Sequence, residues 1–144
     1  MIVNRDTKYY YQDIGLRNAI LSFRQNESTH IMENIIYNEM RMRGWFVDVG
    51  NVFNRVRNAD GQQQRITLEV DFVCNKGCKR IYIQSAWKMF DAEKLEQEKR
   101  SLKLVEDSFR KMIVVGEHTK SWSDEDGIQI ISIYDFLLDM SSTD

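Results

Sequence analysis

The 144-residue chain is 42% hydrophobic and 29% charged, which is typical of one soluble globular domain and excludes a disordered or fibrous chain. Its 16 aromatic residues suffice for a sizeable core, and no run of about 20 apolar residues indicates a membrane span. The net charge of −2 is unevenly spread, because residues 1–90 carry 13 Lys/Arg and 9 Asp/Glu, whereas residues 91–144 carry 7 and 13. This asymmetry permits one basic surface without demanding a nucleic-acid partner.

The N-terminus lacks the apolar segment of a signal peptide, so we expect a cytoplasmic location. Cys74 and Cys78 are too few for a disulfide framework. His30 and His118 are far from them in the sequence, and a zinc site needs about four ligands. We interpret the cysteines as two reduced thiols on a hairpin, and they predict no cofactor.

Polar caps divide the N-terminal third of the chain into two helices. Asp13 can cap the first helix, which starts at about Gly15 and places three apolar residues on one side: Leu16, Ile20 and Phe23. Ser28 or Thr29 starts the second helix, and Gly44 ends it, as glycine commonly does. The second helix carries two adjacent apolar stripes: Ile31, Ile35 and Met42, and Met32, Ile36 and Met40.

Glu33 lies in the second helix at the border of its apolar side. At helical spacing its neighbours are Ile36, Tyr37 and Met40. Taken alone, it predicts a boundary glutamate bonded to a tyrosine or a backbone group. A functional role becomes an alternative only together with residues from the strands that follow.

Three strands with hairpin-length connections are expected next, over residues 45–53, 66–74 and 79–88, and they form an antiparallel meander. A turn region between the first two centres on Asp60-Gly61. The second strand places Asp71 on the face opposite Phe72, and the third strand carries Gln84. An acid in an otherwise apolar strand is the most conspicuous feature of this region.

A helix capped by Asp91, a continuous apolar strand at 111–118, and a last strand with a short helix complete the chain. The order of elements predicts a single α/β (α+β) domain over residues 1–144. Its mixed sheet has about five strands, of which the first three are antiparallel, and helices cover both faces.

Several motifs together resemble a known family: KYYYQDIGLRNAIL, MENIIYNEM, LEVDFVC, IYIQSAW and ISIYDFLLD. The chain resembles the PD-(D/E)XK (restriction-endonuclease-like) nuclease fold. More closely, it resembles the C-terminal domain of unknown function of prokaryotic AAA-type ATPases. It contains no GxxxxGK phosphate-binding loop, so it is similar to that C-terminal part alone, as a fragment or as a free-standing gene.

The resemblance implies a site. Glu33, Asp71 and Gln84 match the positions that gather around Mg²⁺ in active enzymes of the fold, with Asp71 and Gln84 as the metal ligands. Active members place a lysine two residues after the last of these, where this chain has Ala86. Lys88 points to the same face as Gln84 and could substitute, although it lies about 13 Å further along an ideal strand.

The missing lysine favours a non-catalytic, nuclease-derived module that binds nucleic acid or a protein partner for an ATPase. DNA binding would use a basic patch near Asp71: Arg41, Arg43, Arg55, Arg57, Arg65, Lys79 and Arg80. Ordinary solvated charges are the alternative interpretation of these residues, because the chain is not basic overall.

Two alternatives for the site stay open. One is a Mg²⁺-dependent or Mn²⁺-dependent DNA or RNA endonuclease that uses Glu33, Asp71 and Gln84, with Lys88. The other treats Glu69, Asp71 and Gln84 as ordinary exposed strand positions, and then they should lie far from Glu33. The sequence sets no oligomeric state.

Overall fold

A computed structural model describes residues 8–23, 27–57, 61–88 and 92–143. They form a mixed six-stranded sheet with the strand order β1-β2-β3-β4-β6-β5. The strands are β1 (Phe46–Arg57), β2 (Gln63–Lys76), β3 (Lys79–Ala86), β4 (Arg110–Val115), β5 (Trp122–Ser123) and β6 (Gln129–Ser132). The helices are α1 (Ile14–Ile20), α2 (Ser28–Met42), α3 (Ala92–Lys103), α4 (Ile133–Leu138) and the 3₁₀ turn η1 (Met140–Thr143).

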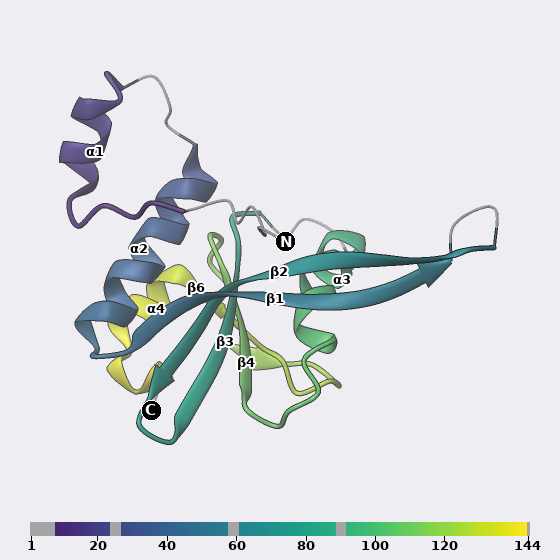
Figure 1. Ribbon diagram of the computed structural model, residues 1–144. Coiled ribbons are helices and arrows are strands. Elements are labelled where there is room, and N and C mark those ends of the chain that lie inside the picture. Colours follow the sequence, from purple (N-terminus) through teal and green to yellow (C-terminus); the bar gives the residue numbers. More distant parts are fainter. Residues whose placement is uncertain (1–7, 24–26, 58–60, 89–91, 144) are drawn as a thin grey trace.

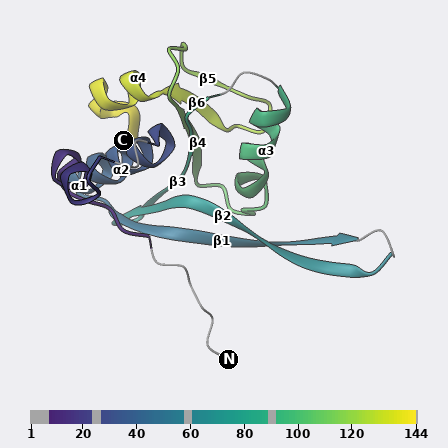
Figure 2. The same ribbon diagram turned by 90° about the horizontal axis from the view of Figure 1, so that it is seen from above.

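The structure confirms the predicted mixed α/β class and the antiparallel order of the first three strands. β4 runs parallel to β3 and β6 runs parallel to β4. The sheet has six strands where about five were predicted, because the two-residue β5 pairs antiparallel with the edge of β6. The predicted cover on both faces is also present, since α2 and α4 lie on one face and α3 lies on the other (Figures 1 and 2).

Each face of the sheet has its own core. On the α2 side, buried residues of α2 pack against Phe72, Ile83 and Phe136. On the α3 side, Leu102 packs against a second cluster that includes Ala86. None of the helices in the described ranges has the length and apolar character needed to cross a membrane.

The helix α1 begins as predicted but packs differently. The Asp13 carboxylate accepts a hydrogen bond of 2.7 Å from the Leu16 amide, so the predicted cap is confirmed. Leu16, Ile20 and Phe23 are 59%, 59% and 66% exposed, so their predicted apolar side faces solvent and not a core. The reason is position: α1 has seven residues and lies beyond the end of the sheet (Figure 1).

In α2 the prediction is confirmed for one stripe and wrong for part of the other. Met32, Ile36 and Met40 are buried, whereas Met42 is 79% exposed in the last turn. The residue at the N-cap is Glu27, without a side-chain cap bond. Gly44 ends the helix with φ +82°, a left-handed backbone that favours glycine, and its amide bonds to the Arg41 carbonyl.

Residues 54–57 and 63–65 of the predicted turn region are strand, and the predicted turn centre at Asp60 lies outside the described residues. β1 continues to Arg57 and β2 begins at Gln63. β3 pairs with β2 from Phe72 onward, so residues 51–57 and 63–69 pair with each other and have no third strand. We call these two segments the ribbon. It projects from the sheet past α3 as a long two-stranded arm (Figures 1 and 2).

A β-bulge marks the base of the ribbon. The β1–β2 register passes from Asp48↔Val73 to Gly50↔Val70, so β2 contains one residue more than β1 over this interval. An extra residue bends a strand and increases its twist, which turns the ribbon away from the sheet. Asp71 lies in this bulged segment.

Replacing Gly50 with alanine tests how tightly the bulge is packed. A Cβ atom at Gly50 would lie 2.7 Å from Val73 Cγ2 and 3.1 Å from Val70 Cβ. Because these neighbours would have to move, we expect Gly50→Ala to lower the free energy of unfolding by about 1–2 kcal/mol. The exposed neighbour Asn51→Ala is the control. Urea denaturation followed by circular dichroism measures both, and equal stability of the two variants would contradict the prediction.

Candidate functional site

The candidate site lies where the ribbon leaves the sheet. Backbone pairing between β2 and β3 ends at Phe72↔Ile83, and side chains replace it at the next positions. The Asp71 amide donates to Gln84 Oε1 at 3.3 Å, and the Ser85 amide donates to Asp71 Oδ2 at 2.8 Å. Asp71 and Gln84 therefore satisfy backbone groups that the diverging strands leave without a ladder partner.

Three carboxylates surround the ammonium group of Lys8. Lys8 Nζ forms an ion pair with Glu69 and lies 3.6 Å from Glu33 Oε2 and 3.8 Å from Asp71 Oδ1. The carboxylates come from α2 and from two positions of β2. We call Lys8, Glu33, Glu69 and Asp71 the carboxylate cluster. With all four groups ionised it carries three negative charges against one positive charge.

The segment that carries Lys8 is fixed against α2 by a buried polar residue. The Asn34 side chain accepts a 2.8 Å hydrogen bond from the Tyr11 amide and donates a 2.7 Å bond to the Tyr11 carbonyl. The Tyr10 ring stacks on Tyr37 with the ring centroids 4.4 Å apart. Lys8 was not among the site residues predicted from the sequence. The signal was its place beside the KYYY aromatics, together with an asparagine inside the apolar helix.

Burial and mutual repulsion dominate the electrostatics of the cluster. Burial raises the pKa of Glu33, as does the charge of Asp71, while Lys8 acts in the opposite direction. Burial also raises the pKa of Asp71, against the hydrogen bond from the Ser85 amide and the charge of Lys8. For Lys8, burial lowers the pKa, but the bond to Glu69 and the nearby acids outweigh it, so the net pKa lies above the ordinary value.

A fourth acid lies next to the cluster on α3. Burial and the charge of Asp71 raise the pKa of Glu98, while its hydrogen bond with Gln84 lowers it. Gln84 Oε1 also accepts a 3.3 Å hydrogen bond from Ser101 Oγ. Gln84 thus connects the bulge of β2 to α3.

The structure brings Glu33, Asp71 and Gln84 together. Asp71 is 7% exposed and shares the Lys8 ammonium with Glu33, so the alternative of ordinary exposed positions far from Glu33 is wrong for Asp71. Lys88 is exposed and lies beyond the C-terminal end of β3. Ala86, which stands at the lysine position of the resemblance, is 3% exposed in the α3-side core. A lysine there would be buried among apolar side chains.

The arrangement does not fit a Mg²⁺ ion held by Asp71 and Gln84. The Gln84 oxygen already accepts bonds from the Asp71 amide and Ser101, and the Lys8 ammonium occupies the space between the carboxylates. Within the described ranges, no group of three or more His, Cys, Asp or Glu side chains has the geometry to hold a metal ion.

The expected basic patch divides into separate parts. Arg55, Arg57 and Arg65 are exposed on the ribbon, whereas Lys79 and Arg80 lie at the β2–β3 turn. At about 3.3 Å per residue, the Arg65 end of β2 is roughly 36 Å from its Lys76 end, which pairs with Lys79. These residues cannot form one phosphate-facing surface beside Asp71.

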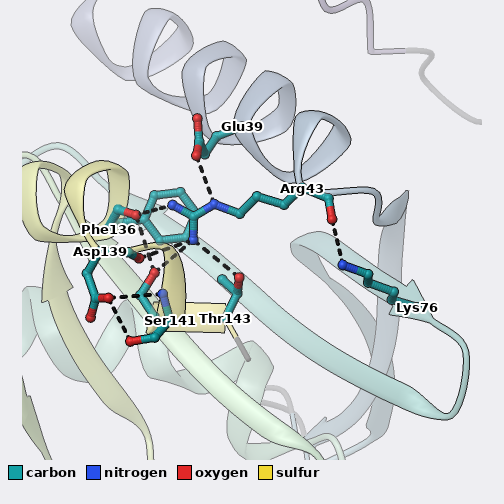
Figure 3. A network of polar contacts seen from close by, with 8 residues as sticks. Glu39, Arg43, Lys76, Phe136, Asp139, Ser141 and Thr143 are labelled. Carbon is teal, nitrogen blue, oxygen red and sulfur yellow. Dashed lines mark hydrogen bonds and ion pairs between the residues drawn. The ribbon is translucent and has the colours of Figure 1, made fainter.

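The two arginines of α2 differ from each other. Arg41 is exposed and lies over the Phe46 ring. Arg43 is 8% exposed and donates hydrogen bonds to Glu39, the Phe136 carbonyl and the Thr143 hydroxyl (Figure 3). Its inclusion in a surface patch is therefore wrong, because its guanidinium holds the C-terminal segment against α2.

The chain is similar in sequence to part of a longer protein. No protein-family model matches the chain. The chain is 27% identical over 133 residues to an uncharacterized protein of Haemophilus influenzae. The match covers 92% of this chain and 29% of the relative, so the chain spans less than a third of the length of that protein.

Proposed function

We propose that this chain is a non-catalytic module of the PD-(D/E)XK nuclease-like fold that binds nucleic acid and acts with, or derives from, an AAA-type ATPase in the cytoplasm. The observation that carries the proposal is the position of Lys8. Its ammonium contacts Glu33, Glu69 and Asp71, where a catalytic cation would have to bind. A resident side-chain cation supports a structural role for these acids.

Two further observations support the non-catalytic interpretation. Asp71 and Gln84 each bond to a backbone amide at the point where the strands diverge, which accounts for both residues without chemistry. Active members of the fold have a lysine where this chain has Ala86, which lies in the core. The nearest lysine, Lys88, lies past the C-terminal end of β3.

A binding and cleavage assay on the whole chain tests the proposal. We expect fluorescence anisotropy to detect binding of labelled DNA at low salt, with an affinity that falls linearly on a log–log plot as salt rises. We expect the DNA to remain intact with added Mg²⁺ or Mn²⁺. Absence of binding to both duplex and single-stranded DNA at low salt would refute the nucleic-acid part, and metal-dependent cleavage would refute the non-catalytic part.

A metal-dependent endonuclease is the second candidate, and the charge of the cluster favours it. Three carboxylates face one ammonium group, so a further cation would find a net negative site if Lys8 moved away. In this case cleavage would need Mg²⁺ or Mn²⁺ and would be lost in Asp71→Ala. Isothermal titration that detects no binding of either metal ion to the purified chain would count against it.

A further inference from the structure

The ribbon has two chemically different faces. In the β1–β2 register Arg55 pairs with Arg65, and Phe53 pairs with Thr67. Because side chains alternate along a strand, these residues share one face with Arg57, and all of them are exposed. The opposite face carries Val52, Val56, Ile66 and Leu68, which are half-buried.

The apolar face is turned toward the body of the protein. Val52 packs against the α3-side core, and Leu68 lies beside Gln97 and Ser101 of α3. Within the described ranges, the other face is exposed at Phe53, Arg55, Arg57 and Arg65, beyond the Lys8–Glu69 ion pair at the base of the ribbon. We call it the arginine face, defined by Phe53, Arg55, Arg57 and Arg65.

The arginine face gathers positive charge that no acid of the described residues compensates. Arg55 and Arg65 lie directly opposite each other, an arrangement of like charges that destabilises a strand pair. The described ribbon residues before Glu69 include no acid, and no ion pair of these three arginines occurs within the described ranges. The Arg65 guanidinium lies over the Phe53 ring, 3.7 Å from its centroid, which orients it on the surface. Such a cluster is complementary to a polyanion.

The shape of the ribbon selects a class of polyanion. A two-stranded ribbon without a third strand is narrow enough to enter the major groove of a DNA duplex, which is about 12 Å wide. Arginine binds phosphate oxygens in a bidentate manner, so three arginines on one face can contact the backbone that borders a groove. The carboxylate cluster at the base of the ribbon is negative and repels phosphates, so we expect phosphates to bind along the outer part of the ribbon.

We propose that the arginine face of the ribbon is the phosphate-binding element of this protein, and that the ribbon enters a groove of duplex DNA. This inference rests on the proposed nucleic-acid binding and adds its location and the form of the ligand. It excludes the β2–β3 turn, with Lys79 and Arg80, as the main contact.

Two charge-matched double variants test the location. In Arg55→Ala/Arg65→Ala, we expect duplex affinity measured by fluorescence anisotropy to fall about 100-fold, since each of the two charge-assisted contacts contributes roughly a factor of ten. The slope of log affinity against log salt should decrease by about 2. In Lys79→Ala/Lys120→Ala, which removes the same charge from exposed positions elsewhere, we expect affinity within about threefold of the unmodified chain.

The outcomes separate this inference from the proposed function. If the unmodified chain binds no DNA, the proposed function itself fails. If it binds and both double variants lose affinity equally, or neither loses it, the arginine face is not the binding element. Tighter binding of single-stranded DNA than of duplex DNA would refute the proposal that the ribbon enters a groove of the duplex. Thermal denaturation checks folding. Arg57→Ala, for which the described residues show no ring contact, should weaken binding about tenfold even if the double variant is unstable.

Discussion

Replacing Arg43 with methionine is expected to lower the free energy of unfolding by about 3–5 kcal/mol, the usual cost of removing one partner from a buried charged network. Arg43 Nε donates to Glu39 at 2.8 Å, and Nη2 donates to the Phe136 carbonyl at 2.6 Å. Nη1 donates to the Thr143 hydroxyl (Figure 3) and to the Ser142 hydroxyl. Methionine keeps much of the apolar stem but leaves Glu39 and these acceptors without their donor.

The neighbouring Arg41→Met is the matched control. Arg41 is exposed and donates one side-chain hydrogen bond, of 3.3 Å, to the Trp45 carbonyl, so we expect a change within about 0.5 kcal/mol. Urea denaturation of both variants measures the difference. Hydrogen exchange should also show faster opening of η1 in Arg43→Met, because Arg43 joins this turn to α2. Similar stability of the two variants would mean that the C-terminal segment is held by its apolar contacts alone.

The class of fold follows from local patterns in the sequence. Alternating apolar residues in 66–74 and 79–88 identified β2 and β3, and the continuous apolar run from Met112 identified the central strand β4. These patterns are informative because burial on one or both faces of a sheet leaves a regular signature. The convergence of Glu33 with Asp71 could be expected only from the family resemblance, because no local pattern links a helix to a strand 38 residues away.

The ribbon was missed for a physical reason. Its strands pair with each other and bury one face partly, so polar residues such as Asn54 and Gln64 interrupt the apolar side. A turn region rich in Asn, Gln and Arg therefore looks like a loop, although backbone pairing extends the strands through it. The length of a two-stranded ribbon is set by pairing, and pairing leaves little trace in a single sequence.

Arg43 and Lys8 show the same limit for side chains. Arg43 occupies the last turn of a helix, where an arginine usually faces solvent and interacts with the helix dipole. Apart from Glu39, four residues earlier, its hydrogen-bond partners lie 93 to 100 residues further along the chain and could not be inferred from spacing. Lys8 is likewise defined by acids 25 and more residues away. The role of such a charged residue depends on partners that are distant in the sequence, and only the tertiary structure shows which residues are in contact.

The second large effect concerns Lys8. At pH 7, we expect Lys8→Met to lower the free energy of unfolding by about 2 kcal/mol, because three carboxylates lose the charge-assisted contacts of one shared ammonium. The Lys8 side chain is 29% exposed, so solvent screens part of the interaction and the full cost of a buried pair does not apply. Lys8→Arg, which keeps the charge, is the control and should cost clearly less.

The destabilisation should depend on pH with a defined sign. The pKa values of Glu33 and Asp71 already lie above their ordinary values, and removing Lys8 raises both further. The folded variant then holds protons at pH values where the unfolded chain has released them, so its stability falls as pH rises through this interval. We expect the difference from the unmodified chain to be full at pH 7 and to shrink as the pH falls toward about 4, because the raised pKa values of Glu33 and Asp71 let these carboxyls take up protons in the folded state and leave Lys8 fewer charges to compensate. Lys8 itself stays charged throughout, since its pKa is raised.

Urea denaturation at pH 4, 5, 6, 7 and 8 measures this dependence. A difference that stays constant from pH 8 to pH 4 would show that Lys8 stabilises the fold through packing and not through the carboxylates.

The same variant also separates the two candidate functions. If added Mg²⁺ restores the stability of Lys8→Met at pH 7 but does not affect Asp71→Asn/Lys8→Met, the carboxylates can hold a metal ion once the ammonium is gone, as the endonuclease requires. If Mg²⁺ has no effect on either variant, Lys8 is the cation for which the cluster is built, as the non-catalytic module requires.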